Sequence, residues 1–370
     1  TSQSQSPHLT SPHLTVLLPP TCTPSLRSSQ PYRSQLQPSP RGLIDFSSSL
    51  VGSPALGLAG LVWSSDKFVE GAAAIANHAG MSPLLIGMTI VSLGTSAPEI
   101  VVSIMASLSG SGELAVGNAL GSNITNIGLV LGVTLLIRSI AIDASTTKRE
   151  LPQMVIVTLL AGALMVDGVL SIVDGALLLF GLVIFLTLLA RRGATPDGSV
   201  DSNPELTPLK AWGVFFFGLV LLVISSRLLV VCAVNIATAL GVSELIIGLT
   251  IVAIGTSLPE LAASVMSALK GHSDIAIGAI VGSNVFNLLV VLAGPGLFGP
   301  LTLNANVMSR DWPVTLLTTG TLMLLAWVAY RNAKHGKAGN GELGRASGVL
   351  LVSMYTAYIG LLIFYPDFAL

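Results

Sequence analysis

The sequence predicts an all-α polytopic membrane protein whose ten transmembrane helices form two inverted five-helix repeats, with helices 2 and 7 discontinuous. First, 52% of the 370 residues are hydrophobic and only 9% are charged, against about a quarter charged in a soluble domain. Second, apolar runs of about 20 residues recur, long enough to cross a bilayer core of about 30 Å. Third, residues 84–126 match residues 245–287 at 21 of 43 positions, at an offset of 161.

The N-terminal stretch 1–45 is rich in Ser and Pro and has no apolar periodicity. Such a composition cannot bury enough apolar surface to offset the entropy of ordering, so we expect a disordered tail. The stretch lacks a basic region followed by an apolar core, which makes it a poor signal peptide.

Ten apolar spans follow the tail. We expect α-helices, because lipid offers no partner for unpaired backbone groups and no strand-like alternation is visible. The expected spans are residues 50–76, 82–108, 114–137, 151–167, 171–190, 210–239, 243–269, 274–298, 313–330 and 347–366. Residues 50–190 then form the first repeat, 191–209 a short cytoplasmic linker and 210–366 the second repeat.

The offset of 161 relates the spans of the two halves. Because five is odd, the second copy enters the membrane in the opposite direction, as in many secondary transporters. Cytoplasmic loops are enriched in Lys and Arg, and an outside N-terminus puts eleven basic residues in them. The eleven are Arg138, Lys148, Arg149, Arg191, Arg192, Lys210, Lys270, Arg331, Lys334, Lys337 and Arg345. The outer loops hold only Arg310, and the tail adds Arg27, Arg33 and Arg41. We therefore expect a multi-pass protein of the plasma (inner) membrane with both termini outside.

Two carboxylates, Glu99 and Glu260, fall well inside predicted spans and are related by the repeat. A charge at the bilayer centre costs at least ~2.5–3.5 kcal/mol, so a duplicated pair indicates a function. The structural alternative is a protonated glutamate that is hydrogen-bonded to a neighbouring helix.

The surroundings of both glutamates are rich in oxygen. Ser92, Thr95, Ser96 and Glu99 share one helical face, and the repeat gives Ala253, Thr256, Ser257 and Glu260. Pro98 and Pro259 lack an N–H, so the carbonyls of Gly94 and Gly255 lose their helical partner and are free to face a cavity. Two further pairs at i,i+4 spacing, Ser122 with Asn126 and Ser283 with Asn287, are positioned to close the cage from neighbouring helices.

An oxygen cage with two negative charges suits hard cations. Calcium takes six to eight oxygen ligands, and sodium ions or protons would also fit. No His or Cys accompanies the glutamates, which argues against zinc or copper. Taken singly, each hydroxyl or amide residue serves equally well as an interhelical hydrogen-bonding group. No nucleotide-binding motif is present, so coupling to ATP, a nucleic-acid partner and a resident cofactor are not expected.

Other repeated positions have simpler interpretations. Six glycines are expected to permit close helix approach: Gly87, Gly117, Gly121, Gly248, Gly278 and Gly282. Arg227, inside the sixth span, is the repeat equivalent of Asp66. Snorkelling or pairing is the default expectation for such an arginine.

The two motif pairs, GTS-x-PE and GSN-x-x-N, resemble those of the cation/calcium exchanger superfamily, most closely its prokaryotic sodium/calcium exchanger branch, from about residue 50 to 366. The resemblance implies that Glu99 and Glu260 ligate both calcium and sodium. It implies calcium ligation by the backbone carbonyls of Thr95 and Thr256. It also implies sodium ligation by Ser96, Ser257, Ser122 and Ser283 and by backbone oxygens at Ser92 and Ala253. Asn126 and Asn287 match the central positions, where related exchangers often have aspartate at the second.

We therefore expect a secondary antiporter, not an enzyme, that extrudes Ca²⁺ in exchange for Na⁺ by alternating access. Its partners would be the two ions, bound transiently, and the lipid bilayer, with a monomer as the working assembly. In the resembling family the long first and sixth helices slide against the core. Ca²⁺/H⁺ or K⁺-dependent exchange at the same site stays open, as does a cation channel. An intramembrane enzyme would use the glutamates as acid and base, but the sequence offers no nucleophile or metal-ligand set.

Overall fold

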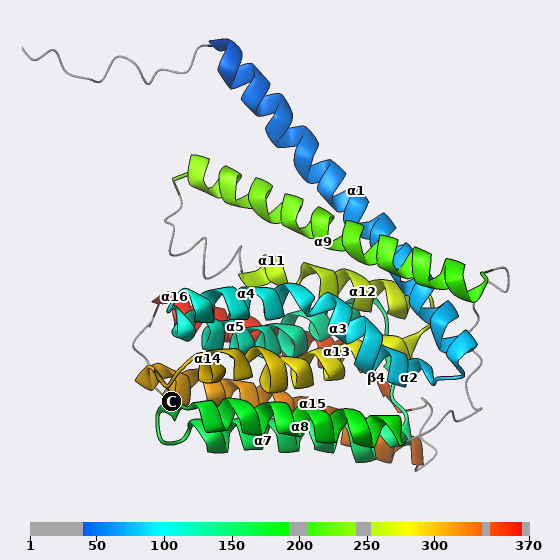
Figure 1. Ribbon diagram of the computed structural model, residues 1–370. Helices are drawn as coiled ribbons and strands as arrows, with labels where there is room; N and C mark the ends of the chain where they lie inside the picture. Colours follow the sequence, from blue (N-terminus) through cyan, green and yellow to red (C-terminus); the bar gives the residue numbers. More distant parts are fainter. Residues whose placement is uncertain (1–39, 192–205, 242–252, 335–340, 365–370) are drawn as a thin grey trace, which may run out of the picture. The chain divides into compact units, whose positions relative to one another are not determined.

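The computed structural model describes residues 40–191, 206–241, 253–334 and 341–364. The chain divides by its contacts into two units, residues 1–46 and 47–370, and the first is described only for the beginning of one helix. The described chain is mostly helical (Figure 1). Most of the linker predicted at 191–209 and the start of the seventh predicted span, residues 242–252, lie outside the described residues.

The first half contains helices that coincide with the first five predicted spans. In order they are α1 (Pro40–Ala79), α2 (Pro83–Ile86), the π-helix η1 (Gly87–Val91), α3 (Ser92–Thr95), α4 (Ala97–Leu108), α5 (Gly112–Thr125), η2 (Asn126–Leu131), α6 (Gly132–Ile137), strand β1 (Ile140–Ala141), η3 (Thr146–Glu150), α7 (Leu151–Met165), β2 (Val169–Leu170) and α8 (Ile172–Ala190). Helix α1 begins inside the stretch predicted as a disordered tail, and the rest of that stretch lies outside the described residues.

The second half repeats this series. It contains α9 (Pro208–Ala239), α11 (Ala253–Thr256), α12 (Leu258–Leu269), α13 (Ser273–Phe286), η5 (Asn287–Val291), α14 (Ala293–Leu297), β3 (Leu301–Thr302), η6 (Val307–Asp311), α15 (Trp312–Lys334), β4 (Glu342–Leu343) and α16 (Arg345–Phe364). Within the described residues, six helices are long and apolar enough to cross a membrane, or seven if the bent pair Pro83–Thr95 and Ala97–Leu108 is one span.

The offset of 161 holds through most of the repeat and then changes. It relates α4 to α12, α5 to α13, η2 to η5, η3 to η6 and β1 to β3 at their first residues. The final strand and helix of the two halves, β2–α8 and β4–α16, are instead related by 173 positions. Helix α15 has 23 residues where α7 has 15, and more residues separate α15 from β4 than α7 from β2. The expected constant offset therefore fails for the fifth span.

Two short antiparallel sheets join the halves by exchanging strands. In one, β1 of the first half pairs with β4 of the second, with Ile140 opposite Leu343. In the other, β2 of the first half pairs with β3 of the second, with Leu170 opposite Leu301. Each half therefore supplies one strand to each sheet.

The long helices α1 and α9 pack closely through two glycines that the repeat relates. A Cβ atom on Gly57 of α1 would lie 2.8 Å from Leu229 Cγ, and one on Gly218 of α9 would lie 2.5 Å from the backbone nitrogen of Phe68. Gly57 corresponds to Gly218 and Phe68 to Leu229, so the two contacts exchange partners between the halves. Such an exchange of partners is expected when α1 and α9 are related by a two-fold axis.

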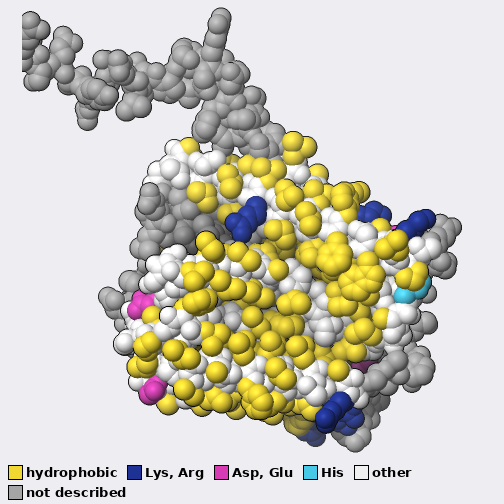
Figure 2. Space-filling model, in the orientation of Figure 1, with side chains coloured by type: hydrophobic (Ala, Val, Ile, Leu, Met, Phe, Trp, Pro, Cys, Tyr) yellow, Lys and Arg dark blue, Asp and Glu magenta, His cyan; other side chains and the backbone are white. Residues whose placement is uncertain are grey.

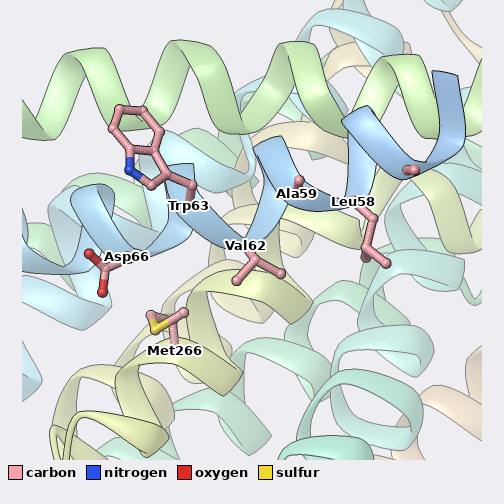
Figure 3. Close-up of a pocket in the computed structure, with 7 residues that line it drawn as sticks. Leu58, Ala59, Val62, Trp63, Asp66 and Met266 are labelled. Atoms are coloured by element: carbon pink, nitrogen blue, oxygen red, sulfur yellow. The ribbon is translucent and has the colours of Figure 1, made fainter. Parts of the chain in front are cut away.

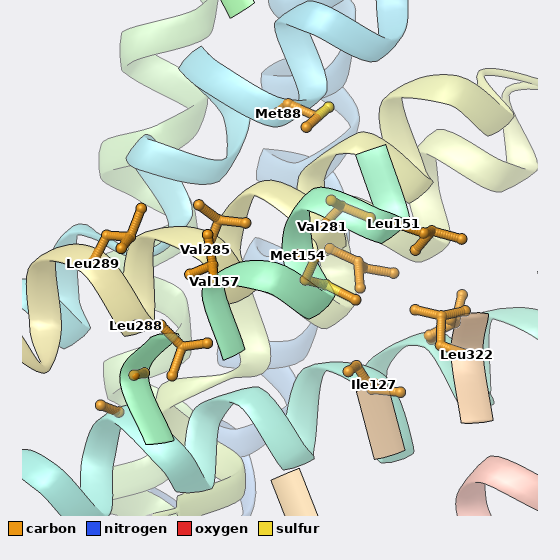
Figure 4. Close-up of a cluster of buried hydrophobic side chains, with 14 of the residues drawn as sticks. Met88, Ile127, Leu151, Met154, Val157, Val281, Val285, Leu288, Leu289 and Leu322 are labelled. Atoms are coloured by element: carbon orange, nitrogen blue, oxygen red, sulfur yellow. The ribbon is translucent and has the colours of Figure 1, made fainter. Parts of the chain in front are cut away.

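Among the membrane-length helices of the described residues, the span of α13, η5 and α14 is the most buried, with 94% of its most apolar stretch inside the structure. Its side chains Val281, Val285 and Leu288 belong to the main apolar core, together with Met88 and Met154 (Figure 4). Other large apolar side chains are exposed, and hydrophobic side chains cover much of the face shown in Figure 2, where charged side chains are few. An apolar exterior around an apolar core is what a lipid environment requires.

Glycines allow α13 to approach the second predicted span. A Cβ atom on Gly278 would lie 2.6 Å from Leu84 O and 3.2 Å from Gly87 Cα, and one on Gly282 would lie 2.5 Å from Met88 O. Close approach is thus confirmed for Gly87, Gly278 and Gly282. For Gly117 and Gly121 no atom of the described residues lies within 4 Å of such a Cβ, and Gly248 lies outside them.

Candidate ion-binding site

Both glutamates follow a break in a helix, as the prolines predicted. In the first half, α3 ends at Thr95 and α4 begins at Ala97, with a bend of 46° between the two segments. In the second half, Ser257 separates α11 from α12. Pro98 and Pro259 lie in the first turn of α4 and α12, where a missing N–H costs nothing because that turn has no intrahelical acceptor.

The two carboxylates are buried and close to each other. Glu99 is 1% exposed and Glu260 is 4% exposed, so both side chains are shielded from bulk solvent. The hydroxyl of Ser96 donates to Glu260 Oε1 at 3.4 Å, which links the two copies of the motif directly. Each carboxylate retains one oxygen, Oε2, that has no hydrogen-bond partner among the described residues. Buried carboxylate oxygens without a protein partner are groups that a bound cation or water could satisfy.

The asparagines of the second motif open π-helical turns. Asn126 is the first residue of η2 and Asn287 the first of η5. In η5 the N–H of Leu292 donates to Asn287 O at 2.9 Å, an i→i+5 bond. Both side chains are buried, and among the described residues Asn126 Oδ1 and both polar atoms of Asn287 lack partners. The sequence pattern did not predict these wide turns, which occur frequently at functional sites.

The remaining predicted ligands lie on the two broken helices and on α5 and α13. Ser92, Thr95 and Ser122 are buried, and the hydroxyls of Ser92 and Thr95 donate to carbonyls of their own helix. Ser257 and Ser283 are buried with hydroxyls that lack partners in the described part of the chain. Thr256 is partly buried at the end of α11, and Ala253 opens the same helix.

Sequence reasoning missed one repeated pair beside the site. Asn123 Nδ2 donates to Asn284 O at 3.2 Å, and Asn284 Nδ2 donates to Ile280 O at 2.7 Å. The two residues correspond through the repeat, so the first contact joins α5 to α13 where equivalent positions meet. Each is the asparagine of a GSN motif, and its repetition in both halves could have identified the pair from the sequence.

One freed carbonyl lies differently from the expectation that it faces a cavity. Gly255 O, which Pro259 leaves without a helical partner, accepts a hydrogen bond from Ser226 Oγ of α9 at 3.0 Å. A freed carbonyl beside a neighbouring helix is satisfied by the nearest donor, here a buried serine. This contact fixes α9 against the broken helix.

The model of the sodium/calcium exchanger protein family matches residues 49–191 and 210–364. This chain belongs to the sodium/calcium exchanger family. Like the family, this exchanger is a membrane transporter of the antiporter type and not an enzyme.

Individual relatives agree with this assignment. The exchanger is 45% identical to the putative antiporter CaxA of Alkalimonas amylolytica over 82% of this chain and 95% of that protein. It is 38% identical to the inner membrane protein YrbG of Escherichia coli over 83% and 94%. Its fold is similar to that of the sodium-calcium exchanger NCX_Mj soaked with zero Na⁺ and Ca²⁺, with a TM-score of 0.71, 34% identity, and coverage of 85% and 98% of the two chains.

A groove of about 610 Å³ lies in this exchanger between α1 and α12 (Figure 3). Its walls are apolar side chains of α1, including Val62 and Trp63, with Met266 of α12 opposite and Asp66 at one end. Asp66 Oδ1 lies 2.8 Å from Lys270 Nζ, which also donates to the Asp66 carbonyl at 3.1 Å. An ion pair thus joins α1 to the C-terminal end of α12.

Proposed function

We propose that this exchanger extrudes Ca²⁺ in exchange for Na⁺ by alternating access at one midplane site bounded by Glu99 and Glu260. One observation carries the proposal. The two glutamates of the repeat are buried together, and each retains a carboxylate oxygen without a partner among the described residues. Burying two ionised carboxylates without compensating charge is strongly unfavourable.

A cation supplies the compensation that the protein lacks. Neither carboxylate forms an ion pair with a described side chain, and the groups that surround them are hydroxyl, amide and carbonyl oxygens. Two ionised glutamates balance one Ca²⁺, whose preferred ligands are oxygens. The same oxygens serve Na⁺ in the second half of the exchange cycle.

The proposed ligand set follows the repeat. Ca²⁺ binds the carboxylates of Glu99 and Glu260 and the carbonyls of Thr95 and Thr256. Na⁺ uses the same carboxylates, the hydroxyls of Ser96, Ser257, Ser122 and Ser283, and the carbonyls of Ser92 and Ala253. Asn126 and Asn287 complete the centre with their amide oxygens.

Two inverted halves are a common architecture for alternating access at one site, and the strand pairing supports this topology. With ten spans, the loops that carry β1 and β4 fall on one side of the membrane, and those that carry β2 and β3 fall on the other. Paired strands must share a side, and both pairs satisfy this condition. Together with the basic loops, this supports a ten-helix inverted repeat in the plasma (inner) membrane with both termini outside.

Flux measurements on the purified chain in proteoliposomes test the function. We expect Ca²⁺ uptake that depends on an outward Na⁺ gradient and is abolished in Glu99→Gln and Glu260→Gln. Glu113→Gln, at an exposed carboxylate in the first turn of α5, is the matched control and should transport normally. Wild-type flux in both site variants would contradict the proposed site.

The same vesicles distinguish the counter-ion. Uptake driven by a pH gradient but not by Na⁺ would replace Na⁺ with H⁺, and a requirement for K⁺ would make the exchange K⁺-dependent. Uptake that needs no counter-ion gradient would identify a channel. Whichever counter-ion is found, the Glu99→Gln and Glu260→Gln variants still test whether the two glutamates form the transport site.

A further inference from the structure

The long helices α1 and α9 carry a second repeated motif that the exchange site does not use. Ser64, Ser65 and Asp66 of α1 correspond to Ser225, Ser226 and Arg227 of α9. The four serines are buried, while Asp66 is partly exposed and Arg227 is exposed. The two halves therefore carry opposite charges at one equivalent position.

The acidic copy is neutralised and the basic copy is not. Asp66 pairs with Lys270, just beyond the end of α12. The equivalent of Lys270 beyond α4 is Ser109, whose hydroxyl donates to Met105 O of its own helix. Within the described residues, Arg227 has no ion pair or hydrogen bond.

Contacts of α9 place Arg227 beside the site. On one side of it, Leu219 Cδ2 would lie 3.2 Å from a Cβ atom on Gly94, the first residue of the first glutamate motif. On the other side, Val230 contacts Gly255 of the second motif, and Ser226 donates to the Gly255 carbonyl. Helix α9 thus lies against both broken helices, and Arg227 lies between its two points of contact.

Lipid is an unfavourable environment for this side chain. Arg227 lies twelve residues before the end of α9, about 18 Å along a helix. Arginines at such depth almost always face the bundle interior or a water-filled cavity. An exposed guanidinium on a helix that packs against both glutamate motifs would therefore lie on a water-filled route between the site and the membrane side where α9 ends.

We propose that Arg227 is a specificity-determining residue of the exchange site, a fixed positive charge on one access route that disfavours Ca²⁺ relative to Na⁺. The inference rests on the function proposed above. Repulsion in free energy scales with the charge of the ion, so a divalent ion is disfavoured twice as strongly as a monovalent one. Under the proposed orientation α9 ends on the outer side, where this bias promotes Na⁺ entry and Ca²⁺ release. The Asp66–Lys270 pair leaves the opposite route without a net fixed charge.

Half-saturating concentrations measured from each side test the proposal, in right-side-out and everted membrane vesicles that contain the full chain. We expect Arg227→Gln to lower the half-saturating Ca²⁺ concentration on the outer side roughly tenfold and that of Na⁺ about threefold, the square root of the Ca²⁺ effect. Values on the inner side should not change. Arg227→Lys keeps the charge and should match the wild type.

A second variant keeps the arginine in place. Ser109→Asp adds a carboxylate at the position equivalent to Lys270 and should lower the outer half-saturating Ca²⁺ concentration in the same direction as Arg227→Gln. Added choline chloride should shrink the wild-type-to-variant difference, because salt screens exposed charges.

The outcomes separate this inference from the proposed function. If Arg227→Gln and Ser109→Asp exchange ions like the wild type, with unchanged half-saturating concentrations on the outer side, the proposed role of Arg227 is overturned. Arg227 would then be an arginine that only snorkels to the membrane surface. Equal changes on both sides would overturn it too. Absence of any counter-ion-dependent Ca²⁺ flux in the wild type would instead overturn the function on which the inference rests.

Discussion

Ser96 donates a hydrogen bond to Glu260 Oε1 at 3.4 Å although the two residues are 164 positions apart. Their repeat equivalents, Ser257 and Glu99, form no such bond, and the Ser257 hydroxyl has no partner among the described residues. The two halves of the site are therefore equivalent in sequence, but their equivalent residues make different contacts. Such asymmetry is expected if the proposed alternating-access site is closed on one side.

The first prediction concerns this hydrogen bond. Ser96→Ala removes a buried donor to Glu260 and one hydroxyl of the proposed Na⁺ set. Because a net hydrogen bond is worth about 0.5–1.5 kcal/mol, we expect the half-saturating Na⁺ concentration to rise roughly two- to tenfold. Thr187→Ala, which removes an exposed hydroxyl on α8, is the control. An unchanged Na⁺ dependence of Ca²⁺ flux in Ser96→Ala would exclude this hydroxyl from the site.

The second prediction concerns the central amide. Asn287→Asp adds a carboxylate beside two others, all buried. A third acid should attract one further cation or proton, so we expect the Na⁺ dependence of flux to steepen or flux to become inhibited by acid. Asn304→Asp, in the exposed segment after β3, should leave both properties unchanged. If Asn287→Asp behaves like the wild type, the amide does not face the transported ions.

The third prediction concerns the link between α1 and α12. Lys270→Met removes the ion pair with Asp66 and should loosen the groove beside Met266. A partly exposed pair is worth about 0–1 kcal/mol, so maleimide should label Met266→Cys up to roughly fivefold faster. Lys67→Met is the matched control, because Lys67 pairs only with residues of its own helix, Glu70 at 2.7 Å and Asp66 at 3.8 Å, among the described side chains. Equal labelling rates in the two variants would show that the pair does not hold the helices together.

The fourth prediction concerns stability. Gly282→Ala places a methyl group 2.5 Å from both Met88 O and Ser92 Oγ, so the helices must separate. Overpacking typically costs about 1–3 kcal/mol, and the melting temperature in detergent should fall. Gly320→Ala, on an exposed part of α15 with no described atom within 4 Å, should hold or raise it. Equal melting temperatures for the two variants would contradict the close packing of α13.

The sequence predicted those features that a local rule determines. Pro98 and Pro259 indicated the helix breaks, because a missing N–H has a fixed consequence for the carbonyl four residues earlier. The repeat then identified Glu99 and Glu260 as a pair, and the structure brings them together. Their roles as ligands stay predictions, as does the inversion of the halves.

Features that depend on contacts between distant helices could not be predicted in this way. The π-turns at Asn126 and Asn287 add one residue to a helical turn, and no residue type marks them. The bond from Ser226 to Gly255 depends on how α9 lies against α11, which neither segment encodes alone. The change of offset from 161 to 173 before α16 could have been found in the sequence, because the second half has extra residues between its fourth and fifth spans. Assuming one constant offset for the whole repeat concealed it.

The exchanged strands have a consequence for how the protein is made. β1 finds its partner, β4, only after about 200 further residues have been synthesised, roughly 10–40 s at ordinary elongation rates. During that time the edge of β1 lacks its native partner, and the first half cannot form either of its two strand pairs. A ribosome that stalls in the linker therefore leaves an unfinished membrane protein for quality control, not a smaller working one. A gene cut in the linker should restore the protein only when both fragments are expressed in the same cell.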